Sequence, residues 1–237
     1  MPHDAVQTGF EAATPERIPA YLQDTYWWAY VHPNAVSFFE RQWLVNAILW
    51  GNFSRLRDAA LAELGEVIHG RILQVACVYG NFTGKLAERL APDASLDVVD
   101  VLPIQLQNLR KKIPAEARVT PCLRNSADLG FANGTYDQTV LFFLLHEQPE
   151  DVRRQTLAEA VRVTRPGGRI VIVDYHQPRH PHPLRYLFKP VLHVLEPFAL
   201  DLWRNEVSTW LPNSVKPEQI RKETFYGGLY QKLVITL

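Results

Sequence analysis

The chain has 237 residues and lacks several features that mark common classes of protein. It has only two cysteines, Cys77 and Cys122, and their spacing matches no metal-binding motif. Two cysteines are too few for a disulfide framework, and we therefore expect free thiols in a reducing compartment. The 25 basic residues are balanced by 25 acidic ones, which leaves no field of one sign to attract a nucleic acid. We therefore expect no nucleic-acid partner.

Long apolar runs and targeting signals are also missing. No segment reaches the roughly 18 apolar residues that a membrane-spanning helix requires. The N-terminus has no basic start followed by an apolar run, and it carries Asp4, Glu11 and Glu16, so we expect neither a secretory signal nor a transit peptide. We expect residues 1–18 to form a mobile arm and residues 19–237 to form a single domain in the cytoplasm.

Aromatic residues, by contrast, are concentrated near the N-terminus. Residues 21–53 hold four of the six tryptophans. Pro33 can open a helix, because a residue of the first turn needs no amide donor. A second helix is predicted between Asn52 and Gly65. We interpret residues 19–66 as a helical lid. The first of these helices is expected to carry one apolar stripe at helical spacing, made of Val36, Phe39, Trp43, Ala47 and Trp50.

Strand and helix patterns alternate through the middle of the chain. Alternation of this kind predicts right-handed crossovers and a parallel sheet covered on both faces. The segment 224–237, with Gly227-Gly228 at its turn, predicts a C-terminal antiparallel hairpin. A mostly parallel, seven-stranded α/β sheet of this Rossmann-like kind, with N-terminal helices and a closing hairpin, resembles the class I methyltransferases, which use S-adenosylmethionine. The predicted strands are 71–76, 96–100, 118–123, 139–144 and 170–174, and the predicted helices between them are 82–90, 104–112 and 151–163.

Three segments are expected to meet beyond the carboxyl ends of the strands, where such folds bind nucleotides. The first is the turn Gln74-Val75-Ala76-Cys77-Val78-Tyr79-Gly80, which has one glycine where such turns have three. The second is Asp100, 20 residues after Gly80, followed by Val101. The third is the pair Asn125-Ser126, which would face adenine. Each signal has a plainer interpretation as a turn or a helix cap. Together they predict a cofactor site that includes Gln74, Ala76, Val78, Gly80, Asp100, Val101, Asn125 and Ser126.

Several longer segments are more distinctive than the fold. They are Tyr-Trp-Trp-Ala-Tyr-Val-His-Pro-Asn-Ala-Val (26–36), the 74–80 turn, Leu-Leu-His-Glu (144–147), Asp-Tyr-His-Gln-Pro (174–178) and Leu-Glu-Pro-Phe-Ala-Leu-Asp-Leu-Trp-Arg (195–204). In these segments the chain resembles the RquA family of rhodoquinone biosynthesis proteins. The resemblance implies that ubiquinone exchanges a ring methoxy group for an amino group. It also implies that S-adenosylmethionine supplies the amine and that manganese(II) assists.

Residues that follow the fourth and fifth strands are candidates for this chemistry. His146 suits an acid or base, and Glu147 suits a metal or amine ligand, although the pair could equally cap a helix. Tyr79 is a third catalytic candidate. Asp174 and His176 suit manganese, the alternative being a cap and a solvated loop histidine. We also expect Tyr26, Tyr30 and His32 to close over the methionine part of the cofactor, and the neighbouring tryptophans to pack in the core.

A lipid-soluble quinone requires access to the bilayer. We interpret residues 178–217 as a membrane or substrate insertion, and 183–203 mixes apolar residues with Arg185 and Lys189. Such a segment can lie at the lipid interface, or it can cover the sheet as an ordinary amphipathic helix. Partners are therefore expected to be ubiquinone in the bilayer and the membrane surface, with the protein held peripherally at the inner membrane.

The glutamine at position 74 stands where methyltransferases carry an acid. A carboxylate there would favour the ammonium form of the cofactor's amine, and an ammonium has no lone pair to attack with. The resemblance implies that the amine is the nucleophile, so neutral Gln74 fits a site retuned for amine transfer. Two alternatives remain: a small-molecule methyltransferase acting on a quinol, and a catalytically silent scaffold of the same fold.

Overall fold

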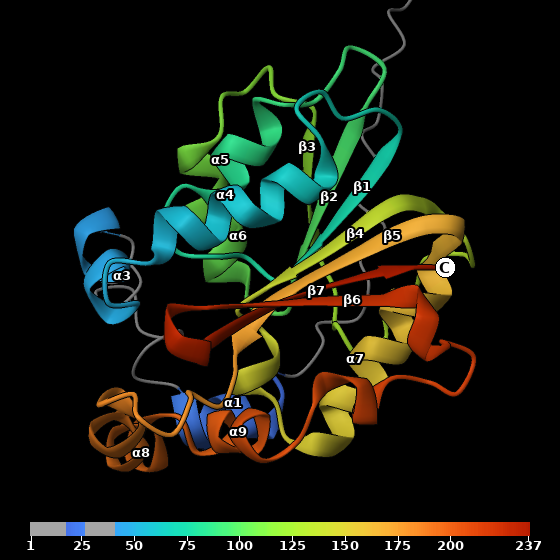
Figure 1. Cartoon of the computed structure of the whole chain (residues 1–237). Coiled ribbons are helices and arrows are strands. Elements are labelled where there is room, and N and C mark those ends of the chain that lie inside the picture. The colour runs from blue at the N-terminus through green and yellow to red at the C-terminus, as the bar shows by residue number, and fades with distance from the viewer. Residues whose placement is uncertain (1–17, 27–40) are drawn as a thin grey trace, which may run out of the picture.

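The structure is a computed structural model that describes residues 18–26 and 41–237. Helices enclose a central sheet in the described part of the chain (Figure 1). The expected mobile arm lies almost wholly outside the described residues. Trp27, Trp28, Tyr30 and His32 also lie outside the described residues, so the expectations for these four side chains stay predictions.

The sheet has seven strands in the order β3-β2-β1-β4-β5-β7-β6. The five strands from β1 to β5 are parallel, and β7 runs antiparallel to both β5 and β6. This confirms the predicted mostly parallel sheet with a closing hairpin. The strands are β1 (Arg71–Val75), β2 (Ser95–Asp100), β3 (Val119–Leu123), β4 (Tyr136–Phe142), β5 (Thr164–Tyr175), β6 (Ile220–Phe225) and β7 (Tyr230–Thr236).

Residues 165–168, Arg-Pro-Gly-Gly, favour a turn before the strand predicted at 170–174, but they lie inside β5. Tyr136 pairs with Thr164, and Gln138 pairs with Arg169, so β5 has extra residues between these two pairings. Such an irregularity is a bulge, and Gly167 adopts the positive φ of +76° that the bulge requires. The segment is therefore a kink in a long strand, and β5 begins earlier than the apolar pattern indicated.

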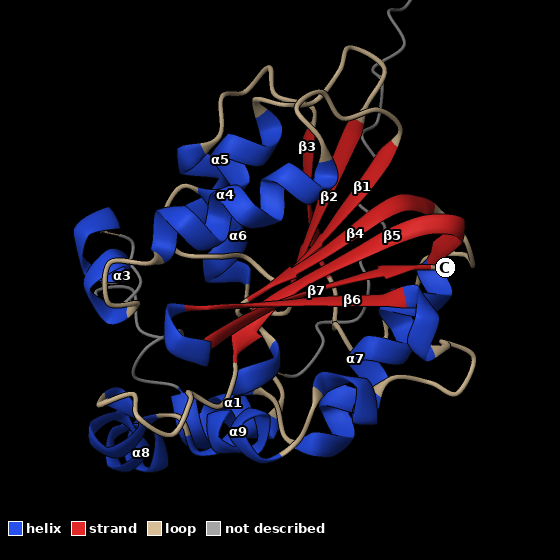
Figure 2. Ribbon diagram, viewed as in Figure 1, coloured by secondary structure: helices blue, strands red, loops and turns tan. Residues whose placement is uncertain are grey.

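Helices cover both faces of the sheet (Figure 2). Helices α4, α5 and α6 lie on one side, and α7 lies on the other. In α4 the residues Leu56, Ala60 and Leu64 are buried at helical spacing, and Gly65 follows the last turn of this predicted helix. The helices of this part are α4 (Phe53–Leu64), α5 (Phe82–Ala87), α6 (Pro103–Lys112) and α7 (Glu150–Val163).

The N-terminal helices lie at the carboxyl ends of the parallel strands. They are α1 (Ala20–Tyr26) and α3 (Gln42–Ile48). Val36 and Phe39 of the predicted apolar stripe lie outside the described residues, and the described part of the stripe does not face the core, because Trp43 is 62% exposed and Trp50 is 45% exposed. The helix ends at Ile48, and Trp50 follows with φ of +52°, so the helical spacing no longer applies there. Val45 and Leu49 make the buried contacts instead.

The segment between β5 and β6 folds as short helices: α8 (Leu184–Leu195), α9 (Asp201–Arg204) and three 3-10 turns, Pro197–Leu200, Val207–Trp210 and Pro217–Gln219. In α8 the residues Leu184, Phe188 and Leu192 are buried, so one side of the helix covers the core. Tyr186, Leu187 and Val191, on the same helix, are exposed. Among the described helices, none combines the length and apolar character that crossing a membrane demands.

Candidate functional site

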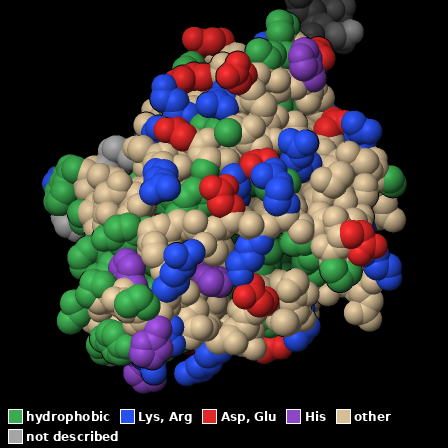
Figure 3. All heavy atoms as spheres, in the orientation of Figure 1, with side chains coloured by type: hydrophobic (Ala, Val, Ile, Leu, Met, Phe, Trp, Pro, Cys, Tyr) green, Lys and Arg blue, Asp and Glu red, His purple; other side chains and the backbone are tan. Residues whose placement is uncertain are grey.

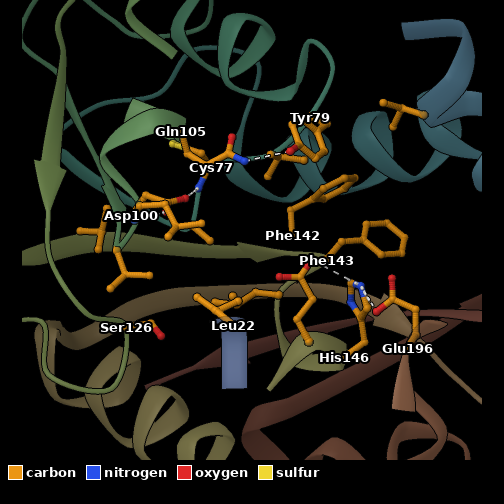
Figure 4. Close-up of a pocket in the computed structure, with 18 of the residues that line it drawn as sticks. Leu22, Cys77, Tyr79, Asp100, Gln105, Ser126, Phe142, Phe143, His146 and Glu196 are labelled. Atoms are coloured by element: carbon orange, nitrogen blue, oxygen red, sulfur yellow. Dashed lines mark hydrogen bonds and ion pairs between the residues drawn. The ribbon is translucent and has the colours of Figure 1, made fainter. Parts of the chain in front are cut away.

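A cavity of about 180 Å³ lies beyond the carboxyl ends of β1, β2, β4 and β5. This is where an open α/β sheet binds its ligand. Figure 4 shows Asp100, Cys77 and Gln105 at one end of the cavity and His146 with Glu196 at the other, with Phe142 and Phe143 between them. We call the first end the cofactor wall and the second the histidine wall.

The turn after β1 forms part of the cofactor wall. Ala76, Cys77, Val78 and Tyr79 line the cavity. Ala76 has φ of +72°, in the left-handed region that glycine tolerates better than any residue with a Cβ. The backbone has therefore kept the conformation of a glycine turn although the glycine itself is absent.

Gln74 and Gly80 are not among the described residues that line this cavity. The Gln74 side chain is fully buried, and its Nε2 donates a hydrogen bond to the Ala76 carbonyl at 3.0 Å. Its Oε1 is buried without a hydrogen-bond partner in the described part of the chain. Gln74 thus stabilises the strained turn through its hydrogen bond to Ala76, whereas the sequence predicted direct contact with the cofactor.

The same turn is tied down from α6. Lys112 Nζ donates to the carbonyls of Val78 and Gly80, at 3.2 Å each. Gln105 Nε2 donates to the Tyr79 hydroxyl at 2.9 Å. Tyr79 is therefore held at the cofactor wall, a position better suited to shaping the ligand pocket than to proton transfer.

Asp100 ends β2 and lines the cavity. Its Oδ2 accepts from the Cys77 backbone N–H and its Oδ1 from that of Leu102, both at 2.8 Å. Burial raises the pKa of Asp100 to about 6, although these backbone donors oppose the rise. Each carboxylate oxygen has a second acceptor position, so Asp100 can still accept from ribose hydroxyls.

Val101 and the segment after β3 complete the cofactor wall. Val101, Asn125 and Ser126 all line the cavity, so the structure brings these predicted residues together. Asn125 Oδ1 accepts from the Ala127 N–H at 2.9 Å, which fixes its amide. Ser126 Oγ lies 3.0 Å from the Thr156 hydroxyl and also accepts from Gln148.

Aromatic side chains line the middle of the cavity. The rings of Phe143 and Tyr175 meet edge-on with centroids 5.6 Å apart, and Phe143 stacks edge-on against His146 at 6.0 Å. Phe143 has φ of +55°, an uncommon backbone conformation for an aromatic residue. A flat, apolar ring would find complementary surfaces here.

His146 and Asp174 form a buried pair at the histidine wall. His146 Nδ1 lies 2.9 Å from Asp174 Oδ1. Asp174 is fully buried and also accepts from the backbone N–H groups of Leu145 and Tyr175, at 2.8 and 2.7 Å. Arg153, on α7, donates to the carbonyls of Leu145 and Gln148 and so fixes the turn that carries His146. The other ring nitrogen, Nε2, lies between Glu147 and Glu196, at 3.8 and 3.9 Å.

The surrounding carboxylates determine the charge of His146. Burial, the largest single influence, lowers its pKa, but the charge and hydrogen bond of Asp174 act in the opposite direction. With further contributions from Glu196 and Glu147, the pKa of His146 rises to about 9. The imidazole is therefore protonated at neutral pH and suits a general acid rather than a base.

The predicted metal pair is not brought together. Asp174 is occupied by His146 and by backbone donors, as described above. His176 Nδ1 lies 2.8 Å from the Gly228 carbonyl, and its Nε2 lies 2.9 Å from Lys222 Nζ. Within residues 18–26 and 41–237, no group of three or more His, Cys, Asp or Glu side chains could hold a metal ion. The two residues were paired because both follow the same strand, but Asp174 contacts His146 after β4, whereas His176 contacts Gly228 and Lys222 of the hairpin.

Sequence reasoning missed several cavity residues. Tyr21 and Leu22, on α1, line the cavity, as does Glu196 after α8. Burial raises the pKa of the Tyr21 phenol, and Glu147 adds to the rise, so Tyr21 is a neutral donor. Glu196 lies in the distinctive 195–204 segment, which was the available signal. Tyr21 had none beyond its place in an aromatic-rich stretch.

The strand order and the site beyond its carboxyl ends are those of a class I methyltransferase fold. Residues 72–168 match the family described as "Methyltransferase domain". The chain is also similar to N-methyltransferase NodS from Bradyrhizobium japonicum, solved with S-adenosyl-L-homocysteine. The TM-score is 0.55 and the identity 16%, over 77% of this chain and 84% of that one. At this identity the likeness shows the fold alone.

Sequence relatives define the family more closely. The chain is 32% identical over 191 residues to the ubiquinone/menaquinone biosynthesis C-methyltransferase UbiE of Syntrophotalea carbinolica, covering 79% of this chain and 78% of that one. It is 26% identical to the demethylmenaquinone methyltransferase of Lactococcus lactis over 187 residues, 74% of this chain and 73% of that one. The chain belongs to the S-adenosylmethionine-dependent methyltransferase family that includes these enzymes.

Proposed function

We propose that the protein converts ubiquinone to rhodoquinone by replacing a ring methoxy group with the amino group of S-adenosylmethionine. The observation that carries the proposal is His146, held by Asp174 beside an aromatic-lined cavity that also reaches Asp100. Support for a quinone substrate comes from the relatives, whose names place them in quinone biosynthesis. Support for the amine transfer comes from the resemblance to rhodoquinone biosynthesis proteins.

The geometry fits the requirements of the exchange. A new C–N bond forms at the ring carbon that bears the methoxy group, and the C–O bond to that group breaks. The bond between the nitrogen and the cofactor's α-carbon must break as well. This step balances when the quinone ring takes two electrons and two protons from the N–H and Cα–H groups, and water then hydrolyses the resulting imine to a 2-oxo acid and the aminoquinol. His146 can donate its Nε2 proton to the departing oxygen, so that methanol leaves. Before that step, its positive charge stabilises the negative charge that develops on the quinone oxygen. Asp174 keeps the ring oriented throughout, because it holds Nδ1.

The cofactor wall supplies binding without adding charge near the amine. Asp100 is proposed to accept from the ribose hydroxyls, and Asn125 with Ser126 to contact adenine. The 74–80 turn contains no acidic residue, so it contributes no carboxylate that would raise the pKa of the cofactor's amine. Gln74 supports this arrangement by holding the Ala76 carbonyl.

Manganese is implied only by the resemblance. The Asp174–His176 pair does not fit it, since each side chain is occupied by a different neighbour. Every step above is therefore assigned to the chain's own side chains.

Ubiquinone dissolves in the bilayer, so the proposal places the protein at the cytoplasmic side of the inner membrane. The exposed side of α8, with Leu187 and Val191, supports a peripheral contact there.

The mass of the quinone product tests the proposal. Purified protein would be incubated with ubiquinone and with S-adenosylmethionine that carries heavy nitrogen in its amino group. We expect a lighter quinone that has gained the heavy nitrogen, with manganese present and absent as separate arms. The second candidate is a quinol C-methyltransferase, which the 32% identity to UbiE favours. Ubiquinone has no unsubstituted ring carbon, so a separate incubation with a demethylated quinol tests this candidate, and a heavier, methylated product would support it. A folded protein that fails to bind S-adenosylmethionine in calorimetry would point to a scaffold.

A further inference from the structure

A second cavity, of about 150 Å³, lies outside the proposed catalytic site, against α8 and α9. Three of its described lining residues are cationic, and none is acidic. An enclosed space with this lining attracts an anion. The lining consists of Gln177, Arg185, Tyr186, Lys189, Leu200, Trp203 and Arg204.

The cations of this cavity are only partly engaged by the protein. Arg185 donates one hydrogen bond to the Pro178 carbonyl at 2.7 Å. Arg204 lies 3.8 Å from Asp201, which is too far for a hydrogen bond. Lys189 is exposed and makes no ion pair within the described part of the chain. Most of their donor capacity therefore remains available to a ligand.

Trp203 provides an independent indication. Its side chain is only 6% exposed, yet its indole Nε1 has no hydrogen-bond partner among the described residues. A buried N–H without an acceptor costs free energy, and native proteins rarely leave one unsatisfied. Trp203 lines the cavity together with the three cations, which makes a phosphate oxygen a candidate acceptor for this donor.

The surroundings of the cavity are apolar. Tyr186, Leu187 and Val191, on the same helix, are 60%, 65% and 43% exposed. Trp50 packs edge-on against Phe188 with ring centroids 6.0 Å apart, so the end of α3 lies beside α8. Hydrophobic side chains gather over α3 and α8 at the left and lower left of Figure 3, with basic and histidine side chains among them.

We propose that this cavity binds the phosphate of an anionic phospholipid headgroup, while the exposed apolar side chains of α8 and α3 enter the lipid. A small anion dissolved in water gains nothing from an apolar surround, whereas a lipid headgroup comes with acyl chains attached. Ile48, on α3, lines the catalytic cavity as well, so docking here brings that cavity to the membrane surface. The inference deepens the membrane contact of the proposed function and rests on it only in that respect.

Vesicle binding by paired variants tests the proposal. Wild-type protein should sediment with vesicles of equal phosphatidylglycerol and phosphatidylcholine, and poorly with phosphatidylcholine alone. The double variant Lys189→Gln, Arg204→Gln should bind the anionic vesicles about 30-fold more weakly, at about 1 kcal/mol for each charge. The control Arg110→Gln, Lys111→Gln removes two exposed charges from α6 and should bind like wild type. Equal losses in both double variants would show general electrostatics and overturn the site.

Two further substitutions separate the parts of the surface. Trp203→Phe removes the N–H and keeps an aromatic ring, and it should weaken anionic binding about tenfold. Leu187→Ser should weaken binding to the same vesicles, whereas Val67→Ser, at a similarly exposed valine near the start of β1, should not. Leu187 suits this test because its neighbours Phe188 and Leu192 are buried in the core.

Two more arms separate the ligand sources and the two proposals. Competition by millimolar inorganic phosphate would show a soluble-anion site and overturn the lipid assignment, if phosphate without vesicles also changes the tryptophan fluorescence of wild type but not that of Trp203→Phe. Amination of a short-tailed, water-soluble quinone should be unchanged in the Lys189, Arg204 double variant. If wild type aminates that quinone but ignores anionic vesicles, the lipid site fails and the proposed function stands.

Discussion

Asp100 and Asp174 both end a parallel strand, both are buried, and both accept backbone hydrogen bonds. They differ in what else reaches them. Asp100 meets backbone donors and faces the cavity, so burial raises its pKa to about 6 and its remaining lone pairs face a ligand site. Asp174 meets the imidazole of His146, and its acceptor positions are filled by the protein. Asp100 is therefore arranged to bind a ligand, and Asp174 is arranged to position His146.

The hydrogen-bond partners of a buried acid, rather than its position at the end of a strand, therefore decide whether the acid binds a ligand or positions another side chain. The partner of Asp174 comes from the segment after β4, which is the neighbouring strand of the sheet. The partner of Asp100 is the turn after β1, on the strand beside β2. The two walls of the cavity can therefore be tested separately.

The largest effect is expected from Asp174→Asn. It leaves the charged His146 without its buried counter-ion, which typically costs about 3–5 kcal/mol of stability. Thermal unfolding should show a clearly lower midpoint, and the rate of amination should fall because the imidazole loses its orientation. Asp93→Asn, at an exposed acid, is the control and should leave both unchanged. A variant with wild-type stability would mean that the pair contributes nothing to the fold.

His146→Gln should lower the rate and also the stability, because it leaves the buried Asp174 carboxylate without its cation. Loss of a general acid typically slows a reaction by about 10² to 10⁴-fold. Binding of S-adenosylhomocysteine, measured by calorimetry, should be unchanged because His146 is on the opposite wall. Comparable activity in the variant would remove His146 from the chemistry.

The pH dependence of the wild type gives a second measure of His146. Its pKa is raised from 6.5 to about 9, so the charged pair stabilises the fold fully below about pH 6.5. That stability, and the acid needed for catalysis, are lost as the pH rises through about 9. The plot of kcat/KM against pH should fall on this alkaline limb, and His146→Gln should lack that limb.

Asp100→Asn should weaken the binding of S-adenosylmethionine by about 1–3 kcal/mol, the scale of a lost charge-assisted hydrogen bond. Wild-type affinity should also fall as the pH drops through about 6, because protonation removes the acceptor charge. Fold stability has the opposite sign, since a raised pKa stabilises the protonated form below about pH 3.8, and that gain is lost as the pH rises through about 6. Unchanged affinity in a folded variant would assign the ribose to another residue.

The sheet could be predicted from the sequence because its signals are local. Buried runs such as 139–142 and the glycine pair at 227–228 specify their own strand and turn. The cofactor wall was largely predictable too, since Asp100 and Asn125 follow strands whose order the fold defines. The Asp174–His146 pair was not, because both residues were predicted but their contact depends on side-chain direction after two different strands. Glu196 and Tyr21 reach the cavity from helices whose placement depends on tertiary packing alone.

Ala76→Gly should give the smallest effect, and it measures how much strain the turn at the cofactor wall carries. Ala76 holds φ of +72°, which costs a residue with a Cβ about 1–2 kcal/mol. Glycine removes that strain but loses about 0.5–1 kcal/mol more conformational freedom on folding. The variant should therefore be more stable than wild type by about 1 kcal/mol or less, measured as a rise of about 2–4 °C at most in the unfolding midpoint. Gly167→Ala is the matched control, because Gly167 has φ of +76° and open space for a Cβ, so it should lose stability by a similar amount. If Ala76→Gly is less stable than wild type, the Ala76 methyl makes packing contacts that outweigh its strain. The alanine would then be part of how this turn is built, and the amination rate of the variant should fall with its stability.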